Sequence, residues 1–461
     1  MIHDAAHVPS AGSGAYPLRP GNRVRPLIDG EPALGRIAEA VEAARRSVWV
    51  TVAFIERTAR LPGRRGTVFD LLDRAAARGL DVRVLFWHEP ELDAILPGSH
   101  HFPARASERA WLAARAARLR ARWDHVPDFC HHQKSWIVDA GTPDEVAFVG
   151  GINLEQSSFV PPGHPPPTEG ETVHDLYLEI RGPAATDVHH NFVQRWNEAS
   201  ERERPCGAWP EPAVVDDLPF PSRLSAPAGD VPVQITRTVR AACYTRDVPT
   251  PGGTAFPIAG GERSVHEQYV AAIAAARRTL YFEQQFLASV DVLAGITQAL
   301  DRGVEVVFLL PGAPMAEVRR ARDDPRYAAF FAHLATFRER ENFTLAGLVG
   351  TGAGGRQQDV YVHAKTLLVD DAWVTIGSAN TAQRSFTGDT ELNASLWHAA
   401  TARALRVELL REHLALDTAD LDDRAALRYF RAIALANRAR RARGEQLAGL
   451  AVALDPATYA T

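Results

Sequence analysis

Two histidines of this chain each stand two positions before a lysine, and these are the only two lysines of the sequence. The pattern His-x-Lys-x4-Asp therefore occurs twice, as His132, Lys134 and Asp139 and again as His363, Lys365 and Asp370. The chain has 51 basic residues, so nearly all of them are arginine. We infer that both lysines occupy positions where a compact ammonium cannot be replaced by a planar guanidinium.

This pair of patterns suits chemistry at phosphorus. A neutral imidazole can attack a phosphodiester while a second, protonated imidazole donates a proton to the leaving alcohol. The attack would give a covalent phosphohistidine. The second histidine would then take a proton from water, and that water would cleave the phosphohistidine. The pattern thus predicts His132 and His363 as catalytic residues and Lys134 and Lys365 as phosphate ligands.

An asparagine follows each pattern after two small residues and one apolar or small residue. The segments are Gly150-Gly151-Ile152-Asn153 and Gly377-Ser378-Ala379-Asn380. Small residues let a backbone approach a phosphate closely. We therefore predict Asn153 and Asn380 as further phosphate ligands.

Four carboxylates complete the predicted site. Each catalytic histidine needs an acceptor on its other ring nitrogen, and Asp175 and Glu391 occupy corresponding places in the two halves. The sequence does not tell which carboxylate serves which histidine, and a surface role for both is an equal alternative. Asp139 and Asp370 lie an odd number of residues after the histidines, so on a regular strand they face away and support the structure.

No metal or other cofactor is predicted. Cys130, His131 and His132 are consecutive, but neighbours on a strand point to opposite faces, and no Cys-x-x-Cys or His-x-x-x-His partner is visible.

The elements that position these residues form an internal duplication. Ala43–Trp49 resembles Ala275–Tyr281, and the other repeated segments recur with nearly the same offset of about 230 residues. In each half, strands alternate with helices. The expected strands are Val48–Ile55 and Val82–Phe86 in the first half and Leu280–Leu287 and Val306–Leu310 in the second. This order predicts an α/β fold of two similar α-β-α sandwich lobes, related by a pseudo-twofold axis, with one active site at their interface.

The predicted division of the chain follows from the repeat. We expect an N-terminal extension over 1–20, a first lobe over 21–204, a Pro-rich linker over 205–232 and a second lobe over 233–461. Both half-sites are present in one chain, so we expect a monomer.

Composition narrows the class of partner. Hydrophobic residues make up 46% and the net charge is −5, which is typical of a folded protein and not of a dedicated nucleic-acid binder. No apolar run reaches the length of a membrane span, and the N-terminus does not read as a secretory signal. Three widely spaced cysteines fit a reducing compartment. We therefore expect a cytoplasmic protein with no stable nucleic-acid partner, in transient contact with a membrane surface.

The paired motifs resemble the signature of the phospholipase D superfamily, and the resemblance extends from Leu27 to Leu414. It is closest to phospholipase D proper, through segments such as His174-Asp175 and Gln383-Arg384-Ser385. Two departures are Gln284, where family members often carry asparagine in Glu-Asn-Gln, and Val173, where they carry tryptophan. An insertion, Val160–Pro167, lengthens the first half.

The resemblance implies hydrolysis of glycerophospholipids to phosphatidic acid, or transfer of the phosphatidyl group to another alcohol, with His132 as nucleophile and His363 as acid and base. The reverse assignment stays open. Alternative functions are a cardiolipin-synthase-like phosphatidyltransferase, a nuclease or other soluble phosphodiesterase with the same two histidines, and a silent lipid- or phosphate-binding scaffold.

Overall fold

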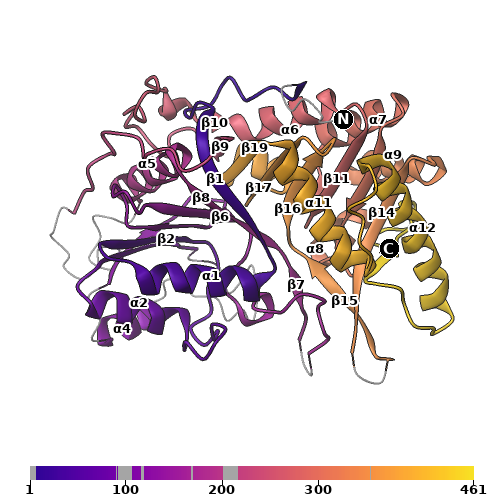
Figure 1. The fold of residues 1–461 in the computed structure, drawn as a ribbon, viewed down its shortest axis with the longest axis horizontal. Helices are drawn as coiled ribbons and strands as arrows, with labels where there is room; N and C mark the ends of the chain where they lie inside the picture. Colours follow the sequence, from indigo (N-terminus) through magenta and orange to yellow (C-terminus); the bar gives the residue numbers. More distant parts are fainter. Residues whose placement is uncertain are drawn as a thin grey trace.

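The computed structural model describes residues 7–89, 91, 106–115, 119–167, 170–200, 216–352 and 355–461. Two lobes lie side by side, the N-terminal one in indigo and magenta and the C-terminal one in orange and yellow (Figure 1). The duplicated α/β fold predicted from the sequence is confirmed. No helix in the described ranges combines the length and hydrophobicity that a membrane span requires.

The first lobe is built on a seven-stranded mixed sheet. Its spatial order is β4-β3-β2-β5-β6-β8-β1, in which β2, β3 and β4 run parallel and the remaining neighbours are antiparallel. The strands are β1 (Arg19–Ile28), β2 (Ser47–Val52), β3 (Asp81–Trp87), β4 (Arg120–Asp124), β5 (Ser135–Val138), β6 (Val146–Gly150) and β8 (Leu176–Arg181).

The second lobe repeats this sheet strand for strand. Its order is β14-β13-β11-β16-β17-β19-β9, again with three parallel strands at one side. The strands are β9 (Val231–Val239), β11 (Thr279–Gln284), β13 (Glu305–Leu309), β14 (Phe343–Thr351), β16 (Lys365–Val369), β17 (Trp373–Gly377) and β19 (Glu391–Trp397). β15 (Gln357–Val362) and β20 (Ala451–Ala453) both pair with β14. The shorter strands are β7 (Val173–His174), β10 (Glu262–Arg263), β12 (Leu287–Ala288) and β18 (Thr381–Ala382).

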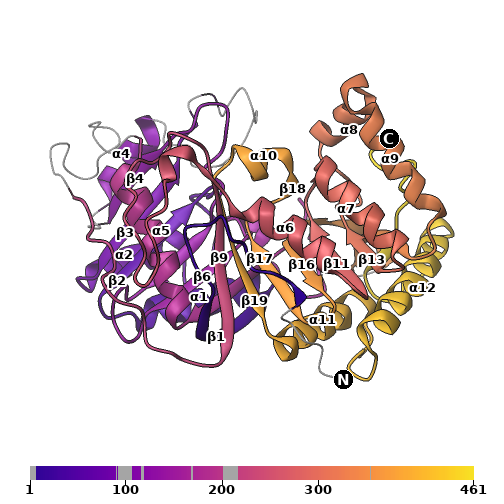
Figure 2. The same cartoon turned by 90° about the horizontal axis from the view of Figure 1, so that it is seen from above.

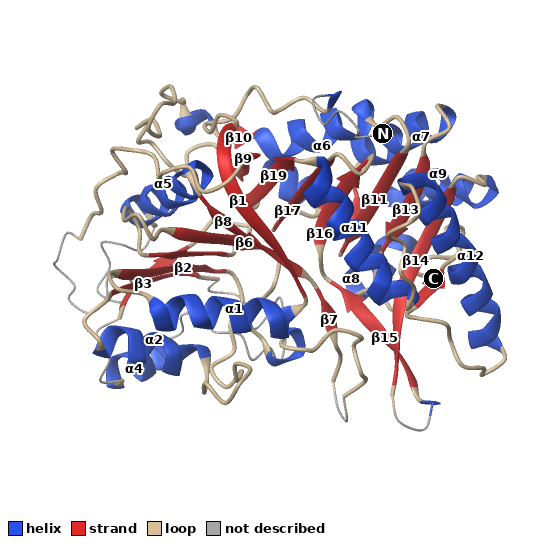
Figure 3. Cartoon of the chain, viewed as in Figure 1, coloured by secondary structure: helices blue, strands red, loops and turns tan. Residues whose placement is uncertain are grey.

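Helices cover both faces of each sheet, as Figure 3 shows in blue against red. The first lobe holds α1 (Gly30–Ala43), α2 (Val68–Ala77), α4 (Ala106–Ala114) and α5 (Pro183–Glu198). The second holds α6 (Ser264–Ala275), α7 (Val290–Asp301), α8 (Ala316–Asp323), α9 (Ala328–Ala335), α10 (Gln383–Thr387), α11 (Ala399–Leu414) and α12 (Asp423–Ala442). Short 3-10 turns occur at Gln156–Ser158, Ile258–Gly260, Pro325–Tyr327 and Thr336–Glu339.

Strand alternation explains how both faces become buried. Val48 and Val50 of β2 pack with α1 and α2, whereas Trp49 between them points to the other face and stacks on Phe192 of α5 at 5.3 Å. Residues two apart share a face, so the side chains of one strand contribute to two hydrophobic cores. The core that contains Trp49 continues into the second lobe and includes residues of α11 and α12.

Strand β1 joins the two sheets because it pairs with β8 on one side and with β9 on the other. Seen from above, the segment before it runs over the second lobe (Figure 2). There the backbone of Ala11 donates to Gln234, and Trp397 donates to the carbonyl oxygen of Val8. The division of the chain stays a prediction, and part of the proposed linker, 205–215, lies outside the described residues.

Candidate active site

Both predicted catalytic histidines lie where the chain enters a central strand. His132 precedes β5, and His363 lies between β15 and β16. The sequence predicts a regular strand through each His-x-Lys segment, whereas in the structure the strands begin only after the histidines. The reason is that both backbones bond across to the opposite lobe: His132 N donates to Thr390 O at 2.9 Å, and His363 N donates to His174 O at 2.9 Å.

The side chains cross between the lobes in the same way. Nδ1 of His132 lies 3.0 Å from Oε2 of Glu391, which begins β19 of the second lobe. Nδ1 of His363 lies 2.6 Å from Oδ2 of Asp175, between β7 and β8 of the first lobe. The two lobes thus exchange carboxylates. The structure answers the question that the sequence left open, namely which carboxylate contacts which histidine.

A pair of short parallel contacts sets up this exchange. His131 faces Thr390 in one of them, and Val362 faces His174 in the other. In both, the next residue along each strand is the histidine or its carboxylate. The pseudo-twofold relation between the lobes therefore brings equivalent residues together twice.

The histidine rings are nearly buried but keep one edge open. His132 is 8% and His363 6% exposed, whereas Glu391 and Asp175 are 0% and 1% exposed. Among the described residues none bonds to Nε2 of either ring. Because the carboxylate contact places a hydrogen on Nδ1, Nε2 carries the lone pair of a neutral imidazole.

The lysines and asparagines lie beside the histidines. Lys134 Nζ donates to the His132 carbonyl oxygen at 2.8 Å, and Lys365 Nζ donates to the His363 carbonyl oxygen. The amide oxygens of Asn153 and Asn380 are buried and bond to none of the described residues. Unpaired buried polar atoms are rare in folded proteins, and binding of a ligand is one explanation for them.

Burial dominates the electrostatics of this cluster. Desolvation, followed by the nearby lysines, lowers the pKa of His132 and His363 well below the usual value. Burial also raises the pKa of Glu391 and of Asp175 to about 7. Desolvation lowers the pKa of Lys365 to about 7, and that of Lys134 in the same direction. An incoming phosphodiester anion would favour the protonated forms of these bases.

Family models agree with this geometry. A model described as "Cardiolipin synthase, PLD-like domain" matches residues 37–196 and 269–412, once in each lobe, and together these segments cover more than half of the chain. A second model, described as "Phospholipase D", matches residues 166–294. The chain belongs to the phospholipase D superfamily.

The named relatives within the superfamily are distant. A cardiolipin synthase 1 of Staphylococcus aureus is 22% identical over 85% of this chain and 67% of its own length. A phospholipase D beta 1 of Arabidopsis thaliana is 25% identical, and the chain spans 44% of that relative. A phosphatidylserine synthase structure from Haemophilus influenzae shares the fold with a TM-score of 0.58 at 12% identity, over 86% of this chain and 88% of its own.

The aspartates of the superfamily motif lie at the other end of their strands. Asp139 accepts hydrogen bonds from three consecutive backbone N–H groups, those of residues 45–47, and Asp370 does the same with residues 277–279. Both aspartates adopt positive φ angles, of 57° and 56°. Each one therefore fixes the turn after its motif strand to the start of the neighbouring strand.

The two departures from the family pattern have different consequences. Gln284 is buried and pairs with Lys365 across β11 and β16, and its side chain donates to Tyr269 and accepts from the backbone of Thr381. Val173 is buried in β7. Gln285, which the sequence did not single out as a site residue, accepts from Lys365 at 3.2 Å and from Asn380 at 3.3 Å. Gln285 could have been predicted as a site residue from its place next to Gln284, in the segment where family members carry Glu-Asn-Gln.

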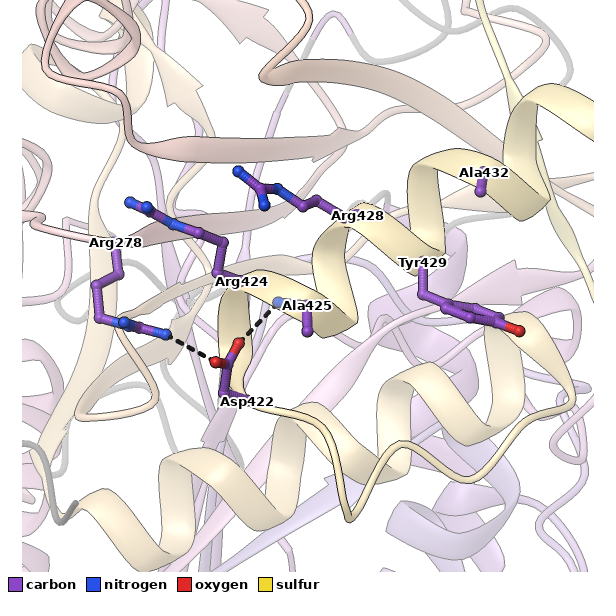
Figure 4. Close-up of a pocket in the computed structure, with 7 residues that line it drawn as sticks. All are labelled: Arg278, Asp422, Arg424, Ala425, Arg428, Tyr429 and Ala432. Atoms are coloured by element: carbon purple, nitrogen blue, oxygen red, sulfur yellow. Dashed lines mark hydrogen bonds and ion pairs between the residues drawn. The ribbon is translucent and has the colours of Figure 1, made fainter.

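A surface groove of about 440 Å³ is unrelated to the histidines. It lies along α12 and is lined by Arg278, Asp422, Arg424, Ala425, Arg428, Tyr429 and Ala432 (Figure 4). Arg278 pairs with Asp422 and Asp423, and Arg428 pairs with Glu305. These ion pairs attach α12 to the second sheet, so we assign the groove no function.

Proposed function

We propose that this protein is a phosphodiesterase that cleaves the headgroup bond of glycerophospholipids and passes the phosphatidyl group to water or another alcohol. Nε2 of His132 attacks phosphorus while His363 donates a proton to the oxygen of the departing alcohol. The P–O bond to the headgroup breaks and a P–N bond to His132 forms. In the second half, His363 takes a proton from the acceptor as its oxygen displaces His132.

The observation that carries the proposal is the exchanged pair of histidine–carboxylate contacts. Each contact holds an imidazole by Nδ1, with the carboxylate nearly fully buried, and leaves Nε2 for chemistry. Such an arrangement orients the ring and stabilises the imidazolium that forms during proton transfer. The same unbonded Nε2 occurs in equivalent histidines of both lobes, as expected of a pair of catalytic residues.

Four side chains would bind the phosphate. Lys134 and Lys365 lie beside the histidine carbonyl oxygens, and rotation of the Asn153 and Asn380 side-chain amides would aim their N–H groups at phosphate oxygens. Buried cationic and amide donors stabilise the charge on the non-bridging oxygens more strongly than they would in water.

The lipid substrate class rests on the relatives. The chain matches proteins named cardiolipin synthase and phospholipase D over most of its length. The same site could also serve a cardiolipin-synthase-like reaction, in which the acceptor alcohol is a second phosphatidylglycerol.

The test is a product analysis on vesicles. The full-length chain is incubated with phosphatidylcholine, with phosphatidylglycerol alone and with single-stranded DNA, each with and without a primary alcohol, and products are identified by mass spectrometry. Phosphatidic acid, or the phosphatidyl ester of the added alcohol, supports the proposal. Cardiolipin from phosphatidylglycerol alone would assign the transferase alternative, and cleavage confined to DNA would overturn the lipid assignment.

A further inference from the structure

A second cluster of polar side chains lies behind Asp175, in the interior of the protein. Asp29, His164, His174 and Glu412 each direct one ligand-type atom to a common point, and these atoms all lie within 4.8 Å of one another. The first three are 0% exposed. The four residues come from four separate segments of the chain, so only folding brings them together.

Four of the six distances between these atoms lie between 2.8 and 3.4 Å, around the edge length of a metal-ligand tetrahedron. Oδ1 of Asp29 lies 2.8 Å from Nδ1 of His174 and 3.1 Å from Nε2 of His164. Nε2 of His164 lies 3.3 Å from Nδ1 of His174 and 3.4 Å from Oε1 of Glu412. Ligands at about 2.0–2.1 Å from a tetrahedral zinc ion are separated by roughly 3.3 Å.

A supporting shell surrounds these ligands. His174 contacts Oε2 of Glu283 through its other ring nitrogen at 3.1 Å, and Oε1 of Glu283 accepts from the Tyr281 hydroxyl at 2.7 Å. A ligating histidine commonly donates its second N–H to a carboxylate, which fixes the ring and its tautomer. The backbone of Gly163 donates to Glu412 at 2.7 Å.

The neighbouring group of His174, Glu283 and His413 is less suited to a metal. Nδ1 of His413 is already bonded to the Tyr281 hydroxyl at 2.9 Å, and it lies 3.7 Å from Glu283. The described residues offer only three ligands there. We therefore place the metal on the Asp29 side of His174.

Charge and burial favour a cation at this point. Two carboxylates and two neutral imidazoles would balance the charge of a divalent ion in this buried cluster. Oδ2 of Asp29 and Nδ1 of His164 are not among the atoms assigned to the ion, and both bond to none of the described residues.

We propose that Asp29, His164, His174 and Glu412 bind a divalent transition metal ion, with zinc as the best match. Nitrogen and oxygen ligands in a tetrahedral set suit zinc, and copper, nickel and cobalt would bind the same donors. The role is structural. Glu412 belongs to α11 of the second lobe and the other three ligands to the first, so the ion clamps the lobes together.

The clamp lies next to the candidate active site. His174 is followed by Asp175, and the carbonyl oxygen of His174 accepts from the backbone N–H of His363 and of Ala364. An ion held by His174 would fix the segment that positions both Asp175 and His363. His164 lies in the insertion Val160–Pro167 of the first repeat, so the insertion would supply one of the metal ligands.

The experiment measures metal content, not activity. The full-length protein is expressed with trace zinc, manganese, iron and cobalt, passed through chelator-treated gel filtration and analysed by inductively coupled plasma mass spectrometry. We expect near-stoichiometric metal. X-ray absorption at the metal edge should show a nitrogen and oxygen shell with imidazole scattering and no sulfur.

His164→Ala and Glu412→Gln should lose the metal, while the control His189→Ala should retain it, because His189 is a buried histidine that pairs with Glu145 outside the cluster. If the variants do not fold, the absorption spectrum of the unmodified chain decides. Only traces of metal in the wild-type protein, even after refolding with zinc, would overturn the proposal, as would full metal retention in both variants.

Discussion

The carboxylate of Glu391 lies 3.0 Å from Nδ1 of His132, although the two residues belong to different lobes and are 259 positions apart. The mirror contact between Asp175 and His363 spans 188 positions. Each lobe therefore holds a histidine that only the other lobe can orient, and neither half of the duplication is a complete site.

Replacing Glu391 with glutamine should lower kcat by about 10²–10⁴-fold and change KM little. Glutamine keeps the shape but cannot stabilise the imidazolium that forms on His132. Steady-state kinetics on a soluble phosphodiester measure the effect. Glu145→Gln is the matched control, because Glu145 is a buried carboxylate that contacts His189 away from the site. Equal kinetics in the two variants would contradict the role of Glu391.

The two histidines should differ in their dependence on the leaving group. His363→Asn should lose about 10²–10⁴-fold on a natural headgroup but still release a burst of p-nitrophenol from an activated ester, since that leaving group needs no proton. The variant should then stall as a phosphoenzyme visible by intact mass. His132→Asn should show no burst with either substrate. The opposite pattern would exchange the two roles.

Gly151→Ala should impair activity through Asp175. A Cβ atom at this position would lie 2.4 Å and 2.6 Å from the two carboxylate oxygens of Asp175 and would push them away from His363. Misplacement by a fraction of an ångström to an ångström lowers kcat by about 10–10²-fold. Gly35→Ala in α1 meets open space, so it should leave kcat unchanged and stabilise the fold by about 1 kcal/mol. Wild-type kcat in Gly151→Ala would refute this mechanism.

Lys365→Met should abolish turnover and yet raise the free energy of unfolding. Burial lowers the pKa of Lys365 from 10.5 to about 7, so between these pH values the folded chain binds fewer protons than the unfolded chain. The destabilisation of the folded state by the buried ammonium is greatest below about pH 7 and decreases as the pH rises toward 10.5. We expect a gain of about 1–3 kcal/mol at neutral pH that shrinks at alkaline pH.

Urea unfolding across this pH range measures the gain. Arg443→Met removes an exposed cation and should show no such pH-dependent gain. A loss of stability in Lys365→Met at neutral pH would show that its hydrogen bonds to the His363 carbonyl oxygen and Gln285 outweigh its desolvation.

The sequence by itself determined the duplication, the α/β class and the residues with phosphoryl chemistry, because a repeated motif and strand periodicity are local properties of the chain. It also favoured a supporting role for Asp139, since an odd step along a strand reverses the side-chain direction.

Only the tertiary structure decided which carboxylate meets which histidine, and that Asp29, His164, His174 and Glu412 converge. Those contacts join segments far apart in the chain, and their geometry depends on how the two lobes dock through β1, β9 and their shared core. No spacing along the sequence encodes that docking, because it results from burial of many apolar side chains at once.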